Sequence, residues 1–296
     1  MKPEVSIIIP ILRTDLRFVE DCLRSILNQS YPHNKLEIVV YDEGSSENYK
    51  KRLETILKEI QTIDVLHYGN EAQTSLAQSR NEAIHRSNGR LIQLLDSDDF
   101  LHPNIISKCI LEFHNNIDFV YTNHLKVSAT GDNVIQERDK SIYQELISAY
   151  KNTIFDPFLH STFLFHSQMF RRTIFDKVGG FREDLKFGEE VDFHLRIEEL
   201  SQHNNYGLIA EYLYYYRNNP SSICHQPDKY FTLIKNIRNI LVESAQRRGY
   251  DVHKAVRVGR AKPTNAAHYA LYDSKQRLIE LPYFDLNSLK ISNNRC

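Results

Sequence analysis

The sequence contains little cysteine, no tryptophan and no long hydrophobic run. Its 4 cysteines are far apart and form no CxxC pair, so we expect unpaired thiols in a reducing compartment. No apolar stretch approaches the roughly 18 residues that cross a bilayer. Residues 1–4 lead straight into a strand-like segment, so no signal peptide is expected. With only 10 glycines and 9 prolines among 296 residues, collagen-like and low-complexity classes are excluded. These absences predict a cytoplasmic, globular protein.

The charge is balanced overall but unevenly distributed. Lys and Arg number 37 and Asp and Glu 38, which argues against a protein built mainly to bind nucleic acid. Residues 226–296 nevertheless carry a formal net charge of +7, so the rest of the chain carries −8. Two interpretations stay open for this basic segment: a solvated tail, or an element that contacts an anionic partner or a membrane surface.

The first hundred residues alternate between strand and helix patterns. Apolar runs predict strands at 5–9, 36–41, 65–68 and 91–95, and helical spacing predicts helices at 15–29, 47–60 and 75–87. Thr14 and Ser46 are candidate N-caps. Four alternations with short connections predict an α/β fold, a Rossmann-like, mostly parallel sheet with helices on both faces.

After residue 100 the alternation is less regular. Helices are predicted at 103–115, 140–150, 172–178, 189–202 and 228–248, and strands at 118–121, 163–170 and 208–216. From Asp251 onward the pattern is too weak to predict any element.

Polar and acidic residues follow three of the predicted strands: Pro10–Arg13, Asp42–Ser45 and Asp96–Asp99. Ligands of open α/β sheets bind beyond the carboxyl ends of the strands, and these ends meet at one edge. We therefore expect a binding site at this edge.

The segment Asp96-Ser97-Asp98-Asp99 is the strongest single signal. Three carboxylates within four residues repel one another unless a cation lies among them, and hard oxygen ligands suit Mg²⁺ or Mn²⁺ carrying phosphate oxygens. An EF-hand loop is excluded because position 6 is Leu101 and position 12 is Ser107. The alternative is a turn that caps the helix starting near Pro103.

Three further segments each allow a structural and a functional interpretation. Asp42–Ser45 is either a strand-to-helix turn or a source of an acid that binds a base or ribose. Arg80 is either solvated or holds a phosphate or base carbonyl. The acids of Gly188–Asp192 either favour a helix dipole or supply a general base. No GxxxxGK[ST], GxGxxG, GxSxG or HExxH motif is present, and the 13 histidines lack metal-ligand spacing.

The ordered segments VSIIIP, YDEGSS, SLAQSRNEAI, LLDSDDFLHP, FLFHSQMFRRTIFDKVGGF, GEEVDFHLR and YLYYYRNNPSSI resemble the family 2 glycosyltransferases of the GT-A fold over residues 4–225. The resemblance implies an inverting transferase, hexosyl or N-acetylhexosaminyl, that uses a nucleotide-diphospho-sugar, usually a UDP-sugar, with Mn²⁺ or Mg²⁺. It also implies a glycan or lipid-linked acceptor hydroxyl and a role in surface glycan or polysaccharide synthesis.

Matched residue by residue, the resemblance implies a catalytic base at Glu190 and a metal ligand at Asp98. It implies a nucleotide site formed by Pro10, Ile11, Arg13, Glu43, Arg80, Asp96 and Ser97. Further candidates are Asp99, Glu189, Asp192, Arg217 near the diphosphate, and His225.

The sequence departs from the family pattern at three places. Glu replaces Asp at positions 43 and 190, and the Tyr-Arg-x-His pattern becomes Tyr216-Arg217-Asn218-Asn219. A catalytically weak relative that binds nucleotide-sugar therefore remains an alternative, as does a binding or scaffold module. A third alternative is a metal-dependent nucleotidyltransferase. That enzyme class would need a basic, phosphate-gripping loop early in the chain, which the glycine-poor loop Pro10–Asp15 does not supply.

We expect a GT-A domain over residues 1–225 and a helical, basic C-terminal extension over 226–296. The extension is predicted to contact the acceptor, a partner or the inner face of a membrane, and to take no part in the donor site.

Overall fold

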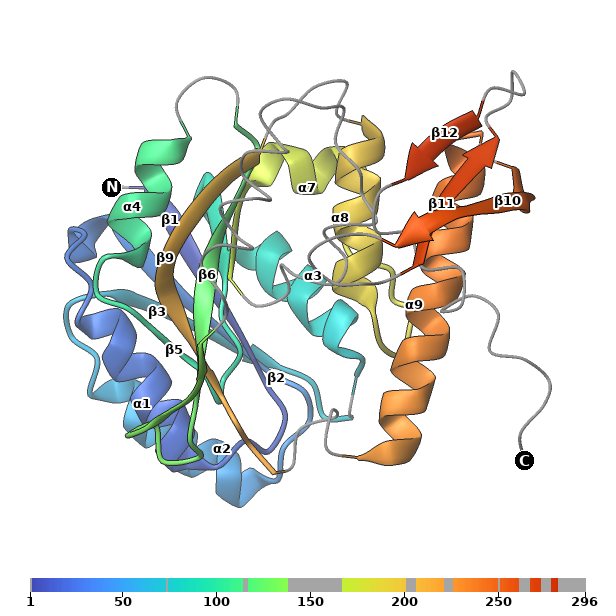
Figure 1. Ribbon diagram of the computed structural model, residues 1–296. Helices are drawn as coiled ribbons and strands as arrows, with labels where there is room; N and C mark the ends of the chain where they lie inside the picture. The colour runs from blue at the N-terminus through green and yellow to red at the C-terminus, as the bar shows by residue number, and fades with distance from the viewer. Residues whose placement is uncertain are drawn as a thin grey trace.

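The computed structural model describes nine stretches of the chain (Figure 1). They are residues 2–72, 74–113, 117–137, 167–200, 206–220, 226–249, 251–260, 267–272 and 278–281. Within them, no helix is both long enough and apolar enough to span a bilayer. The predicted helix at 140–150 and the candidate His225 lie outside the described residues.

A large sheet forms the centre of the molecule (Figure 1). Its strand order is β3-β2-β1-β4-β8-β6-β9-β5, with β7 paired to β6. The strands are β1 (Val5–Ile11), β2 (Leu36–Asp42), β3 (Asp64–Gly69), β4 (Leu91–Leu94), β5 (Phe100–Leu101), β6 (Phe119–Val127), β7 (Val134–Glu137), β8 (Gln168–Arg171) and β9 (Tyr206–Arg217).

Helices connect these strands and cover the sheet. They are α1 (Leu16–Leu27), α2 (Glu47–Lys58), α3 (Leu76–Arg86), α4 (Ile105–Glu112), α7 (Arg172–Val178), α8 (Glu189–Leu200) and α9 (Pro227–Arg247), with a short 3-10 turn, η1 (His33–Lys35). The predicted cap Ser46 is confirmed, since its hydroxyl accepts from Tyr49 N. The prediction that Thr14 is the N-cap of α1 is wrong, because the carboxylate of Asp15 caps this helix by accepting a hydrogen bond from Arg17 N.

Strands β1 to β4 form the predicted parallel half of the sheet. Every residue of β1 and β2 is buried, as continuous apolar strands covered on both faces should be. Alternate residues of β1 serve two cores. Ile7 packs in a core with Val19 of α1, whereas Ile8 packs in one with Ile84 of α3 and Phe193 of α8.

The second half makes the sheet mixed instead of mostly parallel. Strand β8 lies antiparallel between β4 and β6, and β9 returns parallel to β6. The strand predicted at 163–170 overlaps β8 at residues 168–170, but the apolar pattern did not predict that this strand lies at the centre of the sheet. Strand β6, predicted at 118–121, continues to Val127 because it pairs with β9 along its whole length.

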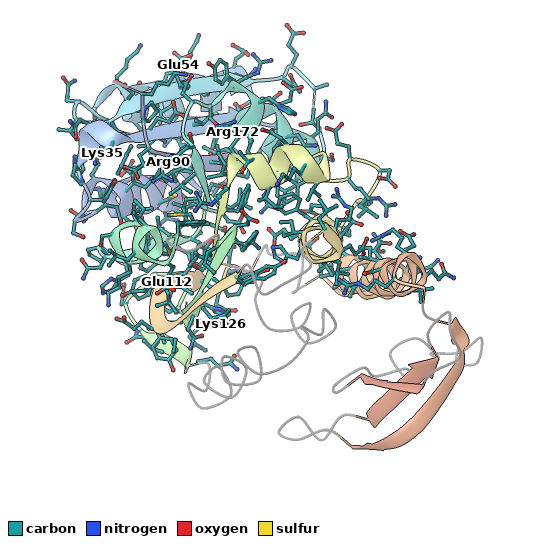
Figure 2. The ribbon with its side chains drawn as sticks, turned by 90° about the horizontal axis from the view of Figure 1, so that it is seen from above. Lys35, Glu54, Arg90, Glu112, Lys126 and Arg172 are labelled. Atoms are coloured by element: carbon teal, nitrogen blue, oxygen red, sulfur yellow. The ribbon has the colours of Figure 1, made fainter. Side chains whose placement is uncertain are left out.

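The C-terminal segment contains the predicted helix and an additional sheet that was not predicted. Helix α9 lies beside α8, and the antiparallel strands β10 (Asp251–Arg260), β11 (Ala267–Tyr272) and β12 (Leu278–Leu281) form a small sheet separate from the large one (Figures 1 and 2). Beyond Arg247, the regular elements in the described part of the extension are strands. Its helix packs directly on the preceding domain.

Candidate active site

The carboxyl ends of β1, β2 and β4 meet at one edge of the sheet, as predicted. Strand β1 pairs with β2 on one side and with β4 on the other, so the chain path reverses at β1. In open α/β sheets, ligands bind outside the strand ends at such a switch point. The loops that follow the three strands are tied together: the hydroxyls of Thr14 and Ser97 hydrogen-bond at 2.6 Å, and Glu43 N donates to Ile11 O at 2.8 Å.

The Arg80 guanidinium gathers three carboxylates from distant parts of the chain. Its side chain is 2% exposed. It contacts Asp96 Oδ1 at 2.9 Å, Glu189 Oε1 at 3.0 Å and Glu190 Oε1 at 2.6 Å. Burial acts to lower the pKa of Arg80, but the charges of Glu190, Asp96 and Glu189 outweigh it and raise the pKa. Arg80 is thus a permanent cation that links the β4 loop to the start of α8.

Glu190 is the most accessible acid at the start of α8. Its side chain is 19% exposed, whereas that of Glu189 is 8% exposed. Arg80 holds Glu190 Oε1, and Gln168 Nε2 on β8 lies 3.4 Å from Oε2. Burial raises the pKa of Glu190 to about 7, and the attraction of Arg80 offsets this only in part. A carboxylate with a pKa near neutrality suits general-base chemistry.

Asp192, the other acidic candidate on α8, is a structural residue. It is fully buried. Its carboxylate pairs with Arg196 Nε at 2.6 Å and Arg182 NH1 at 3.4 Å. Asp192 therefore fixes α8 to its surroundings and is not presented to a substrate.

Sequence reasoning missed Gln168, which the structure brings to Glu190. A signal was available, because Gln168 directly precedes the apolar Met169 and Phe170 in a predicted strand, and a buried polar side chain needs polar partners.

The three aspartates after β4 divide into two kinds. The Asp96 side chain is 37% exposed. Asp98 Oδ2 accepts from Asn219 Nδ2 at 2.9 Å, and burial together with the charge of Asp96 raises the pKa of Asp98. Asp99 is buried and accepts from Tyr214 OH at 2.7 Å and from Arg217 N at 2.8 Å. Asp99 therefore anchors the loop, whereas Asp96 and Asp98 are only partly buried.

The donor set fits a hard divalent cation bound jointly with a ligand. No group of three or more His, Cys, Asp or Glu residues among those described could hold a metal ion by itself. Mg²⁺ and Mn²⁺ commonly take one or two carboxylates together with substrate phosphates. A cation near Asp98 would relieve the unfavourable burial and the repulsion from Asp96 that raise the pKa of Asp98.

Arg217 supports the aspartate loop from behind. Its guanidinium is buried 4.5 Å from the Phe18 ring and 5.1 Å from the Phe100 ring. It donates to Asp98 O at 2.7 Å and contacts Asp21 Oδ2 at 3.0 Å. The residue predicted to lie near a diphosphate thus holds the backbone that carries Asp98.

The remaining nucleotide candidates lie around the turn after β2. Gly44 has φ 86 and Ser45 N donates to Asp42 Oδ1, so the predicted turn is present. Burial raises the pKa of Glu43, at the start of this turn, to about 7. Pro10 and Ile11 are buried within β1 and offer a ligand only their backbone.

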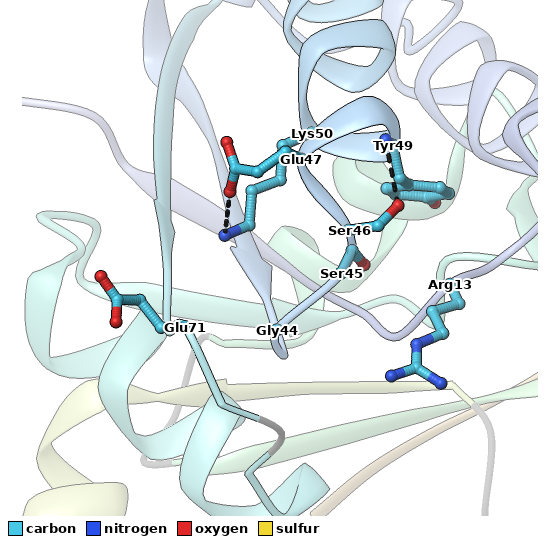
Figure 3. A pocket seen from close by; sticks show the side chains of 8 residues that line it. All are labelled: Arg13, Gly44, Ser45, Ser46, Glu47, Tyr49, Lys50 and Glu71. Atoms are coloured by element: carbon cyan, nitrogen blue, oxygen red, sulfur yellow. Dashed lines mark hydrogen bonds and ion pairs between the residues drawn. The ribbon is translucent and has the colours of Figure 1, made fainter.

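A pocket of about 680 Å³ opens beside this turn (Figure 3). Its lining residues are Arg13, Gly44, Ser45, Ser46, Glu47, Tyr49, Lys50 and Glu71. In Figure 3, Arg13 and Glu71 lie on opposite sides of Gly44. Arg13 has φ 53, a left-handed conformation that is uncommon outside glycine and that places its side chain at this pocket. Of the loop after β1, Arg13 is the residue that reaches the pocket.

Comparisons with known proteins identify the family and the fold. The model of the family described as glycosyl transferase family 2 matches residues 6–179. The uncharacterized glycosyltransferase EpsJ of Bacillus subtilis is 26% identical over 235 residues, which are 77% of this chain and 65% of EpsJ. The chain spans less than two thirds of the length of the first relatives it matches.

Two solved structures share the fold. S. aureus TarS 1-349 in complex with UDP-GlcNAc superposes with a TM-score of 0.62 at 17% identity, over 83% of this chain and 70% of TarS 1-349. The mannosyltransferase PcManGT from Pyrobaculum calidifontis, in complex with GDP-Man and Mn²⁺, superposes with a TM-score of 0.56 at 15% identity, over 83% of this chain and 74% of PcManGT. At these identities the likeness establishes the fold.

Proposed function

This chain belongs to glycosyl transferase family 2, and we propose that it transfers a sugar from a UDP-sugar to an acceptor hydroxyl with inversion at the anomeric carbon. The observation that carries the proposal is the Arg80 network, which places Glu190 and the exposed carboxylate Asp96 around one guanidinium. An acid of pKa about 7 thus stands next to a carboxylate suited to the donor.

The donor side is assigned to the loops after β1, β2 and β4. Glu43 and Arg13 lie at the turn and pocket expected to take the nucleotide. TarS with UDP-GlcNAc and PcManGT with GDP-Man support nucleotide-sugar binding on this fold, and the Mn²⁺ of PcManGT supports a divalent ion. Asp98, with Asp96, would hold Mn²⁺ or Mg²⁺. When bound, that ion supplies positive charge that offsets the charge developing on the leaving diphosphate.

Glu190 is assigned as the general base. Glu190 takes the proton of the acceptor hydroxyl while the hydroxyl oxygen forms its bond to the anomeric carbon. The bond from that carbon to the diphosphate oxygen breaks at the same time, and UDP leaves with the electron pair. Arg80 pairs with Oε1 at 2.6 Å, whereas Oε2 accepts a longer hydrogen bond of 3.4 Å from Gln168 Nε2, so the proton is assigned to Oε2. Attack from the face opposite the leaving group inverts the anomeric carbon.

A panel of UDP-sugars with Mn²⁺ tests the proposal. The true donor should raise Tm well beyond UDP alone, since a ligand that binds only the folded state stabilises it by mass action. The same donor should release UDP when an acceptor glycan is added. If donors stabilise the protein but neither UDP release nor transfer is detected, the chain is the weak, nucleotide-sugar-binding relative. If no UDP-sugar raises Tm more than UDP alone does, and no UDP is released, the proposed donor class is wrong.

A further inference from the structure

Helix α9 covers the glycine from which the proposed catalytic helix starts. Gly188 immediately precedes α8 and has φ 88. A Cβ at this position would lie 3.2 Å from Ile240 Cδ1 and 3.5 Å from Ile237 Cγ1. Ile240 is 1% exposed. Two isoleucines of α9 therefore pack directly on the backbone that leads into Glu189 and Glu190.

A hydrogen bond reinforces this contact. Asn236 Nδ2 donates to Phe187 O at 3.0 Å. Residues 236 and 237 lie four and three positions before residue 240, the spacings at which side chains of a helix are neighbours. One face of α9 thus fixes residues 187 and 188 through a polar and an apolar contact. The amide of Asp192 then donates to Gly188 O at 3.1 Å and closes the first turn of α8.

A second set of contacts joins the other ends of the two helices. Glu199 accepts from Ser244 Oγ at 2.6 Å and pairs with Arg247 Nε at 2.6 Å. Glu199 lies nine positions beyond Glu190, about 13 Å along a helix at ~1.5 Å per residue. These contacts stabilise the same helix pair without touching the turn that carries Glu190, so they provide a matched control.

We propose that Asn236 and Ile240 are positioning residues that hold the Glu190 carboxylate in place beside Arg80 for proton transfer. The inference rests on the proposed function of Glu190. It assigns a role in the reaction to a segment beyond residues 6–179, the part matched by the family model. Small displacements of a reacting group have large kinetic costs, since about 1 Å can cost ~10²-fold in rate.

Hydrogen exchange of the full-length protein tests the positioning directly. In Asn236→Ala and Ile240→Ala, amides of residues 188–193 should exchange at least ~10-fold faster than in the wild-type protein, because the first turn of α8 loses its support. The conservative Ile240→Val should restore most of the protection. Arg247→Ala should leave residues 188–193 unchanged. Unchanged exchange in both α9 variants overturns the proposal.

Turnover then separates positioning from general stability. In the folded fraction, Asn236→Ala and Ile240→Ala should lower kcat by ~10-fold or more with donor KM within ~3-fold, whereas Arg247→Ala should change neither. The proposal is also overturned if Glu190→Gln loses turnover but both α9 variants keep the wild-type kcat. If Glu190→Gln keeps its rate, it is the proposed base that fails, and the exchange measurement alone then decides whether α9 fixes the turn.

Discussion

Two acidic segments, Asp96–Asp99 and Glu189–Asp192, have nearly the same composition but are held in different ways. Each contains three carboxylates within four residues. In each, one acid contacts Arg80 from an accessible position and another is buried away from it. The sequence pattern alone does not distinguish the accessible acid, to which we assign a role in the reaction, from the acid that is buried.

The buried acid of each segment has a different kind of partner. Asp99 accepts from a hydroxyl and a backbone amide, and burial with the charges of Asp98 and Asp96 raises its pKa well above the usual range. Asp192 is flanked by the guanidinium groups of Arg182 and Arg196. The partners of a carboxylate, more than its place in a motif, indicate its role.

The largest expected effect separates Glu190 from Asp192. Glu190→Gln keeps the shape of the side chain and removes its basicity, so kcat should fall ~10²–10⁴-fold while donor affinity changes by no more than ~3-fold. Single-turnover UDP release and calorimetry measure the two quantities. A normal rate in Glu190→Gln with a collapse in folded Asp192→Asn would exchange the roles assigned to these acids.

The second effect concerns stability. Asp192→Asn leaves the cations Arg182 and Arg196 without their shared buried carboxylate, so the free energy of unfolding should fall by about 3 kcal/mol. Asp184→Asn is the matched control, because Asp184 also pairs with Arg182 but its side chain is 66% exposed. Denaturant melts should show a change below ~0.5 kcal/mol for the control. Equal losses in the two variants would contradict the structural role of Asp192.

The third effect tests the ligand role of the first segment. Asp98→Asn, or EDTA added to the wild-type protein, should weaken calorimetric UDP binding in Mn²⁺ by at least ~10-fold, as loss of a carboxylate or of the ion removes a bridge to the diphosphate. Glu190→Gln should bind UDP as the wild-type protein does. If the affinity for UDP is the same with Mn²⁺, with EDTA and in Asp98→Asn, the proposed metal site is wrong.

The smallest effect is a pH dependence. The pKa of Glu190 is raised from 4.5 to about 7, so turnover should increase as pH rises through 7 and the base ionises. Stability should change in the opposite direction, because a raised pKa means that the folded state binds the proton more tightly between these values. The contribution of protonated Glu190 to the stability of the folded state is complete below pH 4.5 and is lost as pH rises through about 7. Relative to the wild-type protein, Glu190→Gln should therefore gain in Tm as pH rises from 5 to 8. A constant difference in Tm across this range would contradict the raised pKa.

Local pattern was sufficient for the first half of the fold. Apolar runs and helical spacing predicted β1 to β4 and α1 to α3, because each of these elements carries its own period and turn residues. The edge that collects Asp96, Asp98 and Glu43 followed from the parallel arrangement. Sequence reasoning thus predicted that these residues share one edge of the sheet before any side-chain contact was known.

Contacts between distant segments could not be predicted in this way. Arg80 and Glu189 are 109 positions apart, and no spacing rule joins them. The burial of Arg217 between Phe18 and Phe100 depends on three separate elements, β9, α1 and β5. The β10–β12 strands were missed because their alternation is weak, and the central position of β8 was missed because topology, not propensity, sets it.

That central position has a consequence for how the protein is made. Strand β8 is synthesised after β6 yet must enter between β4 and β6. Until residues 168–171 leave the ribosome, β4 and β6 have no strand between them, and each keeps an unpaired edge. Such edges template pairing with other chains. The sheet is therefore completed late, from the inside, and a nascent chain that stalls before residue 168 is more exposed to aggregation than one that stalls after β9.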